Sequence, residues 1–331
     1  MMKNKMLQGM VKAGYTTAQK LLASGLKVNS LRTLDTLRKD EWKQYDTAVI
    51  EAAQQRMVVV ADLMSRGLVY RIGNGLGKTV LEYEDQSDMS DAEVNMDGVT
   101  RGRNDRIEFD INYLPLPLTH KDWHLNIRVL NATRQGSSHL DVTQAALASG
   151  KVSEKIENYT VNGASSFAFG GGTIYGLTDH PNRNTGTLNA SWATATGDNM
   201  LDDLKAMKQA SIDDRHYGPW MVYIPTAYEV ALDDDFKAAS DKSIRQRLKE
   251  IAGIIDIRVA DLLGTSSGKT QMVMVQMTAD VIRMVEGLPI TNVEWDEQGG
   301  MVTNFKVMTI LVPQIRADQD DRSGVVNYVA P

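Results

Sequence analysis

The sequence of 331 residues predicts an α+β fold, and three stretches carry that prediction. Apolar residues recur every three or four positions from Trp42 to Gly67, which is typical of a helix with one buried face. Arg106 to Tyr113 alternate apolar with polar side chains, the period of a strand with one wet face. A longer helical pattern follows Ser138, and helices and strands mix after it. The length and the 42% hydrophobic content allow one elaborated domain or two closely linked domains.

The chain opens with a basic arm. Residues 1–39 carry eight lysines and arginines against the single acid Asp35, a net charge of +7, and because the whole chain carries −6 the remainder carries −13. A basic arm on an acidic body indicates contact with nucleic acid or with an acidic neighbouring surface, although a merely solvated amphipathic helix fits equally well. The lysines that carry this prediction are Lys3, Lys5, Lys12, Lys20 and Lys27.

A long two-stranded hairpin is predicted next. Thr79–Asp85 and Arg106–Tyr113 alternate apolar with polar residues, and about twenty mostly polar residues between them form its tip. An isolated hairpin is marginally stable in water, so its apolar surface must be covered. Little of the nearby sequence could cover it, and we therefore expect another subunit to do so. The residues expected in this assembly interface are Leu81, Tyr83, Ile107, Phe109, Ile111 and Tyr113.

The remaining elements follow in order. Leu114-Pro115-Leu116-Pro117 closes the hairpin, because proline cannot continue a central strand. A helix of roughly 20 residues begins after Ser138, which forms a capping box with Asp141. A glycine-rich turn spans residues 169–172. Later helices are predicted at 200–211 and 243–251, and later strands at 220–224, 271–277, 293–295, 305–312 and 324–329.

Composition excludes several classes of function. The chain has no cysteine, which rules out disulfide frameworks, thiolate zinc sites, iron–sulfur clusters and cysteine nucleophiles. No apolar run reaches the roughly 18 to 20 residues that a membrane helix needs, and the first residues lack the apolar core of a secretory signal. We expect the chain to stay in the cytoplasm where it is made.

Two glycine-rich segments invite a nucleotide-binding interpretation, and their spacing contradicts it. Gly73 to Thr79 ends in Gly-Lys-Thr, but position 72, where the first glycine of a phosphate-binding loop belongs, is Ile72. Gly264 to Thr270 is one residue too short in the same way. Both segments are expected to be loops or turns.

Metal and catalytic motifs are also weak. His120 and His124 would share one face of a helix as metal ligands, but the prolines before them favour an extended chain. The acidic runs at 233–235 and 318–321 lack the ligand spacing of a calcium loop. No Gly-x-Ser-x-Gly elbow nominates a nucleophile. We predict no catalytic residue, no metal site and no cofactor.

The order of these elements resembles the Hong Kong 97-type capsid fold, which tailed-phage capsid proteins and bacterial encapsulins share. Residues 42–67 look like the helix that precedes the family's extended loop, and residues 80–113 look like that loop. Residues 118–128 with 138–159 resemble the strand and spine helix of its peripheral domain. Gly176-Leu177-Thr178-Asp179-His180-Pro181 resembles the Gly-Leu-x-Asn/Asp-x-Pro stretch that enters its axial domain, and the chain from Val293 to Asp318 is similar to its last peripheral strands.

The resemblance covers residues 40–331 and implies a division of the chain. It implies a basic N-terminal arm at 1–40, a peripheral-domain helix at 41–72, an extended hairpin loop at 73–117, a peripheral-domain strand and spine helix at 118–163, an axial domain at 164–290 and closing peripheral-domain strands at 291–331.

The resemblance also implies a function. A protein of this type is a major capsid (head) protein that assembles as pentamers and hexamers into an icosahedral shell around phage double-stranded DNA. The implied partners are other copies of the chain, packaged DNA bound without sequence preference, a separate scaffolding protein and a portal, with no membrane and no enzymatic activity. The implied location is the virion, after assembly in the host bacterial cytoplasm. The alternatives are an encapsulin-like compartment around cargo enzymes and an enzyme of unrecognised type.

Overall fold

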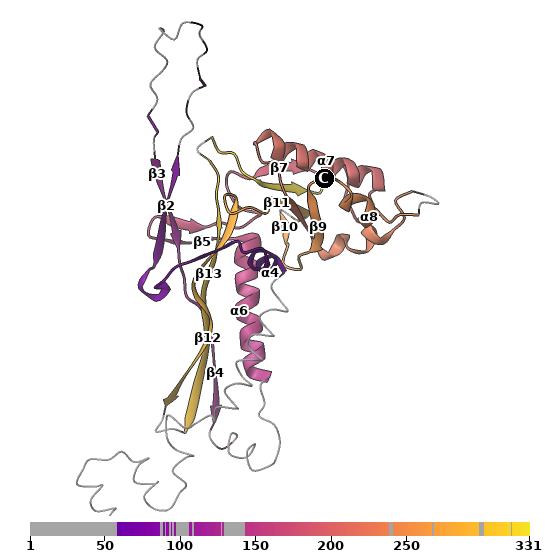
Figure 1. Ribbon diagram of the computed structural model, residues 1–331. Helices are drawn as coiled ribbons and strands as arrows, with labels where there is room; N and C mark the ends of the chain where they lie inside the picture. Colours follow the sequence, from indigo (N-terminus) through magenta and orange to yellow (C-terminus); the bar gives the residue numbers. More distant parts are fainter. Residues whose placement is uncertain are drawn as a thin grey trace, which may run out of the picture. The chain divides into compact units, whose positions relative to one another are not determined.

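The computed structural model describes most of the chain after residue 57 (Figure 1). The described ranges are 58–86, 109–126, 143–237, 241–266, 268–297, 301–318 and 320–331, with isolated positions between 89 and 107 and at 128. The residues form two compact units, which we describe separately. The first contains Leu118–Lys155 and Pro289–Thr309, and the second contains Met57–Pro117, Ile156–Leu288 and Ile310–Pro331. Helix α6 and strands β12 and β13 contribute residues to both.

Two predicted helices are present. Helix α4 (Val58–Ser65) is followed by a glycine-terminated C-cap. Gly67 has a φ of +73°, and the Leu68 N–H donates to the Leu63 carbonyl at 3.0 Å. Helix α6 (Thr143–Asn162) has the predicted length of 20 residues. The first part of the helix predicted from Trp42, and the capping box predicted at Ser138 and Asp141, lie outside the described residues.

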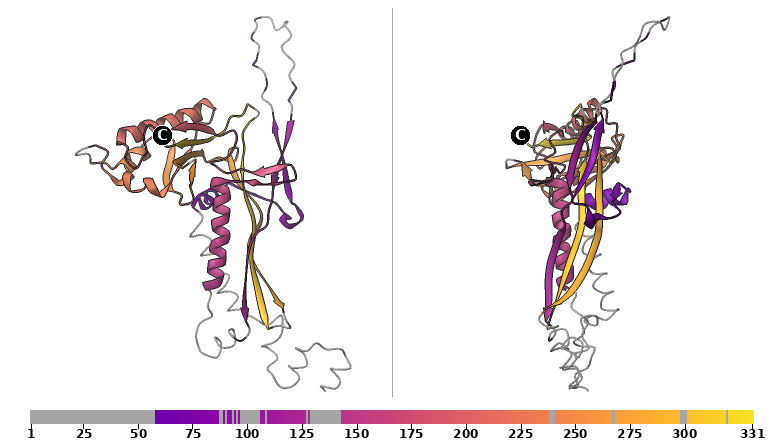
Figure 2. Two further views of the ribbon diagram at one scale, coloured as in Figure 1. Left: turned by 180° about the vertical axis from the view of Figure 1, so that it is seen from behind. Right: turned by 90° about the vertical axis from the view of Figure 1, so that its left-hand side faces the viewer.

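In the first unit, strand β4 (Thr119–Asn126) pairs antiparallel with β13 (Val302–Ile315), and β12 (Ile282–Glu297) lies beside β13 (Figure 2). Trp123 stacks on Phe305 with ring centroids 4.2 Å apart. Strands β12 and β13 are longer than the strands predicted at 293–295 and 305–312, and they contain Pro289 and Pro313.

In the second unit, strand β1 (Val69–Arg71) pairs in parallel with the start of β12. A 3-10 turn, η2 (Gly75–Gly77), leads into the hairpin of β2 (Val80–Gln86) and β3 (Phe109–Pro115). A side chain at Gly75 would place its Cβ 2.0 Å from the carbonyl oxygen of Gly287, so only glycine permits this approach of two backbones. The first glycine-rich segment therefore has a packing role.

The second unit also contains a six-stranded sheet, in the order β7-β14-β11-β8-β9, with β10 pairing on β11. Its predicted helices α7 (Gly197–Asp213) and α8 (Ile244–Lys249) are both present. The 3-10 helices η3 (Thr226–Tyr228) and η4 (Val230–Asp233) follow β8. The strands are β7 (Asn184–Thr187), β8 (Trp220–Ile224), β9 (Ile254–Val259), β10 (Thr265–Ser266), β11 (Lys269–Gln276) and β14 (Val325–Val329).

The position of β14 differs from the expectation that residues 291–331 form one group of closing strands. Strand β14 pairs with β11 and β7 in the six-stranded sheet and does not extend the sheet of β12 and β13. Val325 and Val326 are both buried, Val326 packs in the core on that sheet, and strand pairing of this kind is decided by tertiary packing.

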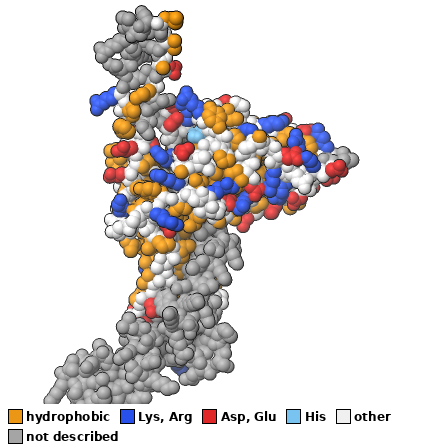
Figure 3. All heavy atoms as spheres, in the orientation of Figure 1, with side chains coloured by type: hydrophobic (Ala, Val, Ile, Leu, Met, Phe, Trp, Pro, Cys, Tyr) orange, Lys and Arg blue, Asp and Glu red, His pale blue; other side chains and the backbone are white. Residues whose placement is uncertain are grey.

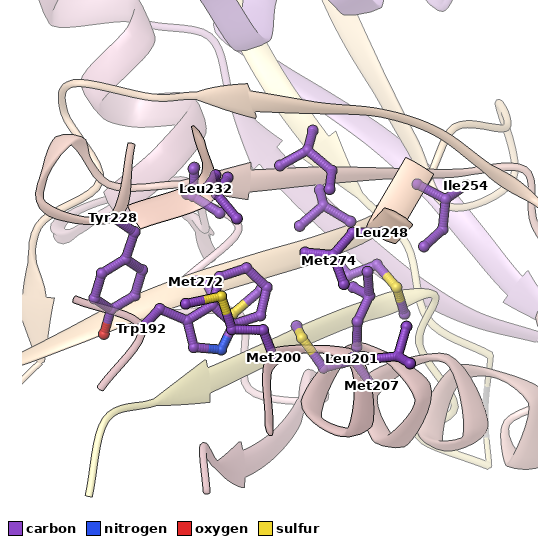
Figure 4. Packing of buried hydrophobic residues seen from close by; sticks show 14 of the residues in the cluster. Trp192, Met200, Leu201, Met207, Tyr228, Leu232, Leu248, Ile254, Met272 and Met274 are labelled. Carbon is purple, nitrogen blue, oxygen red and sulfur yellow. The ribbon is translucent and has the colours of Figure 1, made fainter. Parts of the chain in front are cut away.

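A large hydrophobic core of the second unit lies on this sheet (Figure 4). Helix α7 contributes Met200 and Met207, and β11 contributes Met272 and Met274. Unbranched methionine side chains fill irregular gaps between a helix and a sheet. The rings of Trp192 and Tyr228 pack at one side of this core, 6.1 Å apart.

The end of α6 is fixed by the segment that resembled the entry to an axial domain. The amides of Leu177 and Thr178 donate to the helix carbonyls of Thr160 and Val161, each at 3.0 Å, which satisfies acceptors that a helix end leaves free. Asp179 accepts a bond of 2.6 Å from the Gly176 amide and closes the turn. A short hairpin of β5 (Ala164–Phe169) and β6 (Gly172–Ile174) separates α6 from this turn, with the predicted glycine-rich turn between its strands.

Candidate assembly interface

The register of the β2–β3 hairpin gives it two different faces. Leu81 pairs with Leu114 and Tyr83 with Asn112, so these four side chains share one face. The next pairs, Glu82 with Tyr113 and Glu84 with Ile111, project from the other. We call these the inner face and the outer face, because the first is covered by the chain and the second is not.

The inner face belongs to the core of the second unit. Leu81 and Leu114 are buried with Val285, Ile310 and Val312, and Tyr83 packs against the same cluster. The expectation that the chain cannot cover Leu81 and Tyr83 is therefore wrong. Alternation alone could not separate them from the exposed residues, because register decides which strand positions share a face.

The outer face leaves large apolar side chains in solvent. Phe109 is 57% exposed, Ile111 55% and Tyr113 37%. Hydrophobic side chains are visible along the hairpin in the space-filling view (Figure 3). Ile107 is half-buried and lies outside the strands. An exposed group of large apolar residues on a strand pair indicates a surface that another chain covers.

The β5–β6 hairpin adjoins the base of the outer face. Its turn residue Gly170 lies against Val80, and a Cβ added at the neighbouring Gly171 would lie 3.5 Å from the Tyr113 ring. This contact explains why Tyr113 is less exposed than Ile111. Strand β5 adds two more exposed aromatic side chains, Phe167 and Phe169. Neither residue was predicted, although the alternation Phe-Ala-Phe is a signal for a strand with one apolar face.

A buried polar cluster was not predicted. Glu157 of α6 is buried, and its two carboxylate oxygens accept bonds from the amides of Val59 (2.7 Å) and Val60 (3.2 Å) at the start of α4. This carboxylate satisfies donors that the first turn of a helix leaves free. Burial raises the pKa of Glu157 to about 7, against the opposing effect of these hydrogen bonds.

Asp62 of α4 completes the cluster. One of its oxygens accepts from the Tyr223 hydroxyl at 3.1 Å and the other from the Arg258 guanidinium. Burial raises the pKa of Asp62, while Arg258 opposes the rise. Since both oxygens of Glu157 and both of Asp62 are engaged by the protein itself, the cluster fits a structural clamp on α4 better than an acid–base site.

The second glycine-rich segment and the histidine pair, which the sequence offered as nucleotide and metal sites, lie in ordinary strands and turns. Gly264–Thr270 forms the β10–β11 hairpin, whose turn holds Gly268 at a φ of +80°. His120 and His124 lie on strand β4 and not on a helix. Four residues of extended chain separate them too widely to bind one metal ion, as they could have done on a helix. Among the described residues no group of three or more potential ligands could hold a metal ion. The lysines of the basic arm lie outside the described residues.

A family model matches residues 29–328, and its family is described as one of unknown function, DUF6260. The chain is a member of DUF6260. No curated protein is detectably similar to this DUF6260 chain in sequence. No helix in the described part of the chain is long and apolar enough to cross a membrane.

Solved structures share the fold of this DUF6260 chain. A virus-like particle from Pyrococcus furiosus is similar with a TM-score of 0.63 and 18% identity, over 87% of this chain and 98% of that one. The capsid of Myoviridae phage XM1 is similar with a TM-score of 0.63 and 11% identity, over 81% and 91%. The capsid of a native GTA particle is similar with a TM-score of 0.57 and 10% identity, over 80% of this chain and 89% of that one. The DUF6260 chain has the Hong Kong 97-type capsid fold, and the predicted α+β fold class is confirmed.

Proposed function

We propose that this chain is the major capsid (head) protein of a tailed bacteriophage, which assembles into an icosahedral shell around double-stranded DNA. The observation that carries the proposal is the outer face of the hairpin, where Phe109 and Ile111 stand more than half exposed on a chain with a capsid fold. An apolar surface of this kind is costly on an isolated protein and is explained when copies of the chain cover it.

The proposed partners follow from this role. Copies of the chain form pentamers and hexamers, a separate scaffolding protein and a portal take part in assembly, and no membrane is involved. The mature location is the virion, and assembly takes place in the host bacterial cytoplasm. The hairpin at 73–117 is the extended loop, and residues 41–72 and 118–163 with strands β12 and β13 serve the peripheral domain. Residues 164–281 serve the axial domain together with β14, which pairs in its six-stranded sheet.

The basic arm is proposed to face the lumen of the shell. Its net charge of +7 would neutralise phosphates of packaged DNA and release counterions, with no need for sequence recognition. On the outer surface the same lysines would meet only solvent. Lys3, Lys5, Lys12, Lys20 and Lys27 are the residues in this proposed lumenal arm.

We propose no catalytic role. The glycine-rich segments that ended in Lys78-Thr79 and Lys269-Thr270 are used for backbone packing and for a hairpin turn. The buried carboxylates have their oxygens engaged by the chain itself. Nucleotide hydrolysis by purified protein that disappears in Lys78→Ala or Lys269→Ala would contradict this part of the proposal.

Electron microscopy of the expressed, purified chain tests the main proposal. We expect closed shells built from five-fold and six-fold clusters, alone or after addition of a scaffolding protein from the same phage. A chain that stays monomeric at every concentration, with and without scaffold, would refute the proposal.

An encapsulin-like compartment is the second candidate, because the Pyrococcus furiosus particle matches over 98% of its own chain. The two candidates differ in what the particle holds. Particles purified from infected cells should contain nuclease-protected double-stranded DNA if the chain is a phage capsid protein, and a specific protein cargo if it is a compartment shell.

A further inference from the structure

A group of hydrogen-bond donors lacks acceptors at one end of the β12–β13 pair in the second unit. Arg283 of β12 donates from Nε to the side-chain oxygen of Gln314 on β13, at 2.7 Å. Arg316 follows two positions after Gln314, so both point to one face of the strand pair, and the Arg316 amide bonds to the Val281 carbonyl at 2.9 Å. The Arg283 guanidinium therefore contacts the Gln314 side chain, and Arg316 lies at the same end of the strand pair.

Two buried donors in this group are unsatisfied. Gln314 is 1% exposed, its oxygen is taken by Arg283, and its Nε2 amide finds no acceptor among the residues that the structure describes. The Nε of Arg316 is also buried and meets no acceptor in that part of the chain. Buried donors are nearly always satisfied in folded proteins, so these two point to a missing acceptor.

The charges in this group do not balance. Among the carboxylates that the structure describes, Arg316 forms an ion pair with Asp85 alone, at 4.0 Å, and Asp85 also accepts a hydrogen bond from Asn112. Arg283 lies over the Tyr70 ring, 4.5 Å from its centroid, and makes no ion pair with any described carboxylate. Burial, and then the charge of Arg316, lowers the pKa of Arg283.

We propose that Arg283, Gln314 and Arg316 bind an oxyanion of the phosphate type, beside the ring of Tyr70. Guanidinium groups present paired donors that match the oxygens of phosphate, and the Gln314 amide adds a neutral donor. The anion satisfies the unpaired donors and relieves the repulsion between the arginines. A cation is disfavoured there, because the free atoms of the group are donors. The site is independent of the proposed shell, since every residue in it belongs to one copy of the chain.

Isothermal titration of inorganic phosphate into the purified chain, in chloride buffer of constant ionic strength, tests the proposal. We expect saturable binding of about one phosphate per chain. Arg283→Gln should weaken it about tenfold or more, because it removes a charge and a donor fork. Arg283→Lys keeps the charge but loses the fork, and it should show a smaller loss. Near-ultraviolet circular dichroism in chloride buffer checks that both variants stay folded.

Arg71→Gln is the matched control. Arg71 lies on the neighbouring strand β1 and is paired with Glu286 at 3.0 Å, so its removal changes the net charge equally without touching the donors. We expect phosphate affinity within twofold of the unchanged chain. An equal loss in Arg71→Gln, or binding that does not saturate, would reveal an adventitious ion only and overturn the site.

A second arm identifies the source of the phosphate. If a short DNA duplex competes with inorganic phosphate for the unchanged chain but not for Arg283→Gln, the site takes a nucleic-acid phosphate; if it does not compete, the site takes the free anion. The proposal is also overturned if phosphate fails to bind while Arg283→Gln blocks association between copies, since the donors then serve a carboxylate of a second copy.

Discussion

Changing Phe109 and Ile111 to Ser should impair assembly while leaving each subunit folded. Both side chains project from the outer face of the hairpin and are 57% and 55% exposed. Their loss removes little that the isolated subunit buries. Tyr83, which the sequence alone also favoured for this test, is unsuitable because it packs against the subunit's own core.

The magnitude follows from the exposed fractions. Complete burial of such a side chain is worth about 1.5 to 3 kcal/mol, and roughly half of each side chain remains to be covered, so each contributes about 1 kcal/mol on assembly. The double variant should lose about 2 kcal/mol per hairpin contact, which corresponds to about a 30-fold increase in the subunit concentration needed for assembly.

Light scattering against protein concentration measures that threshold, and circular dichroism checks the fold. Val230→Ser is the matched control, because Val230 is an exposed aliphatic residue on η4, outside the hairpin, and its loss should leave the threshold unchanged. Leu81→Ser should unfold or destabilise the subunit, since Leu81 is in the core. An unchanged threshold for the double variant would refute the assignment of the outer face, and a loss of folding would show that the subunit itself buries it.

Three further predictions concern stability and placement. The pKa of Glu157 rises from its usual 4.5 to about 7, so the folded chain holds this proton more tightly than the unfolded chain. The protonated Glu157 contributes its full stabilisation below about pH 4.5, and this stabilisation is lost as the pH rises through about 7. Denaturant unfolding across this range should show that the stability of Glu157→Gln depends less on pH than that of the unchanged chain. Gly75→Ala should destabilise the subunit by about 2 kcal/mol or more, because its Cβ would meet the backbone of Gly287, whereas Gly73→Ala meets nothing within 4 Å and should be neutral in the same unfolding assay. Amine labelling of intact particles should modify the lysines of the basic arm much less than labelling of denatured protein, and equal labelling would place the arm outside.

Several elements could be predicted from sequence because local pattern and tertiary context agree. Strand β8 has the predicted bounds because all five of its residues are buried and apolar, a run that is too short for a helix. Helix α6 shows a long apolar stripe. Strand β7, Asn184–Thr187, gave no signal: its four residues are polar or glycine, and its pairing with β14 is set by the sheet around it.

The candidate sites were less predictable, for a different reason. The alternation in the hairpin strands identified apolar residues that must be buried, but it could not tell whether the same subunit or another one buries them. That depends on the register between the two strands, which neither strand encodes alone when a long tip separates them. Glu157, Asp62 and Arg258 come together from elements about a hundred residues apart. Arg283 and Arg316 look like ordinary surface charges in the sequence, and only the pairing of β12 with β13 brings their donors together.

The two faces of the hairpin have a consequence for the order of events in assembly. A two-stranded hairpin alone is marginal in water, but burial of Leu81 and Leu114 in the subunit core fixes the base of this one before any partner is present. The outer face is then presented already ordered, and association does not have to bear the entropy of ordering its strands. If the outer face of one copy packs against a different surface of the next copy, the contact is heterologous. Repeating a heterologous contact builds a closed ring when the rotation between copies allows it. Folding and assembly thus depend on different residues of the same two strands, and for that reason substitutions on the outer face should change assembly without changing the subunit.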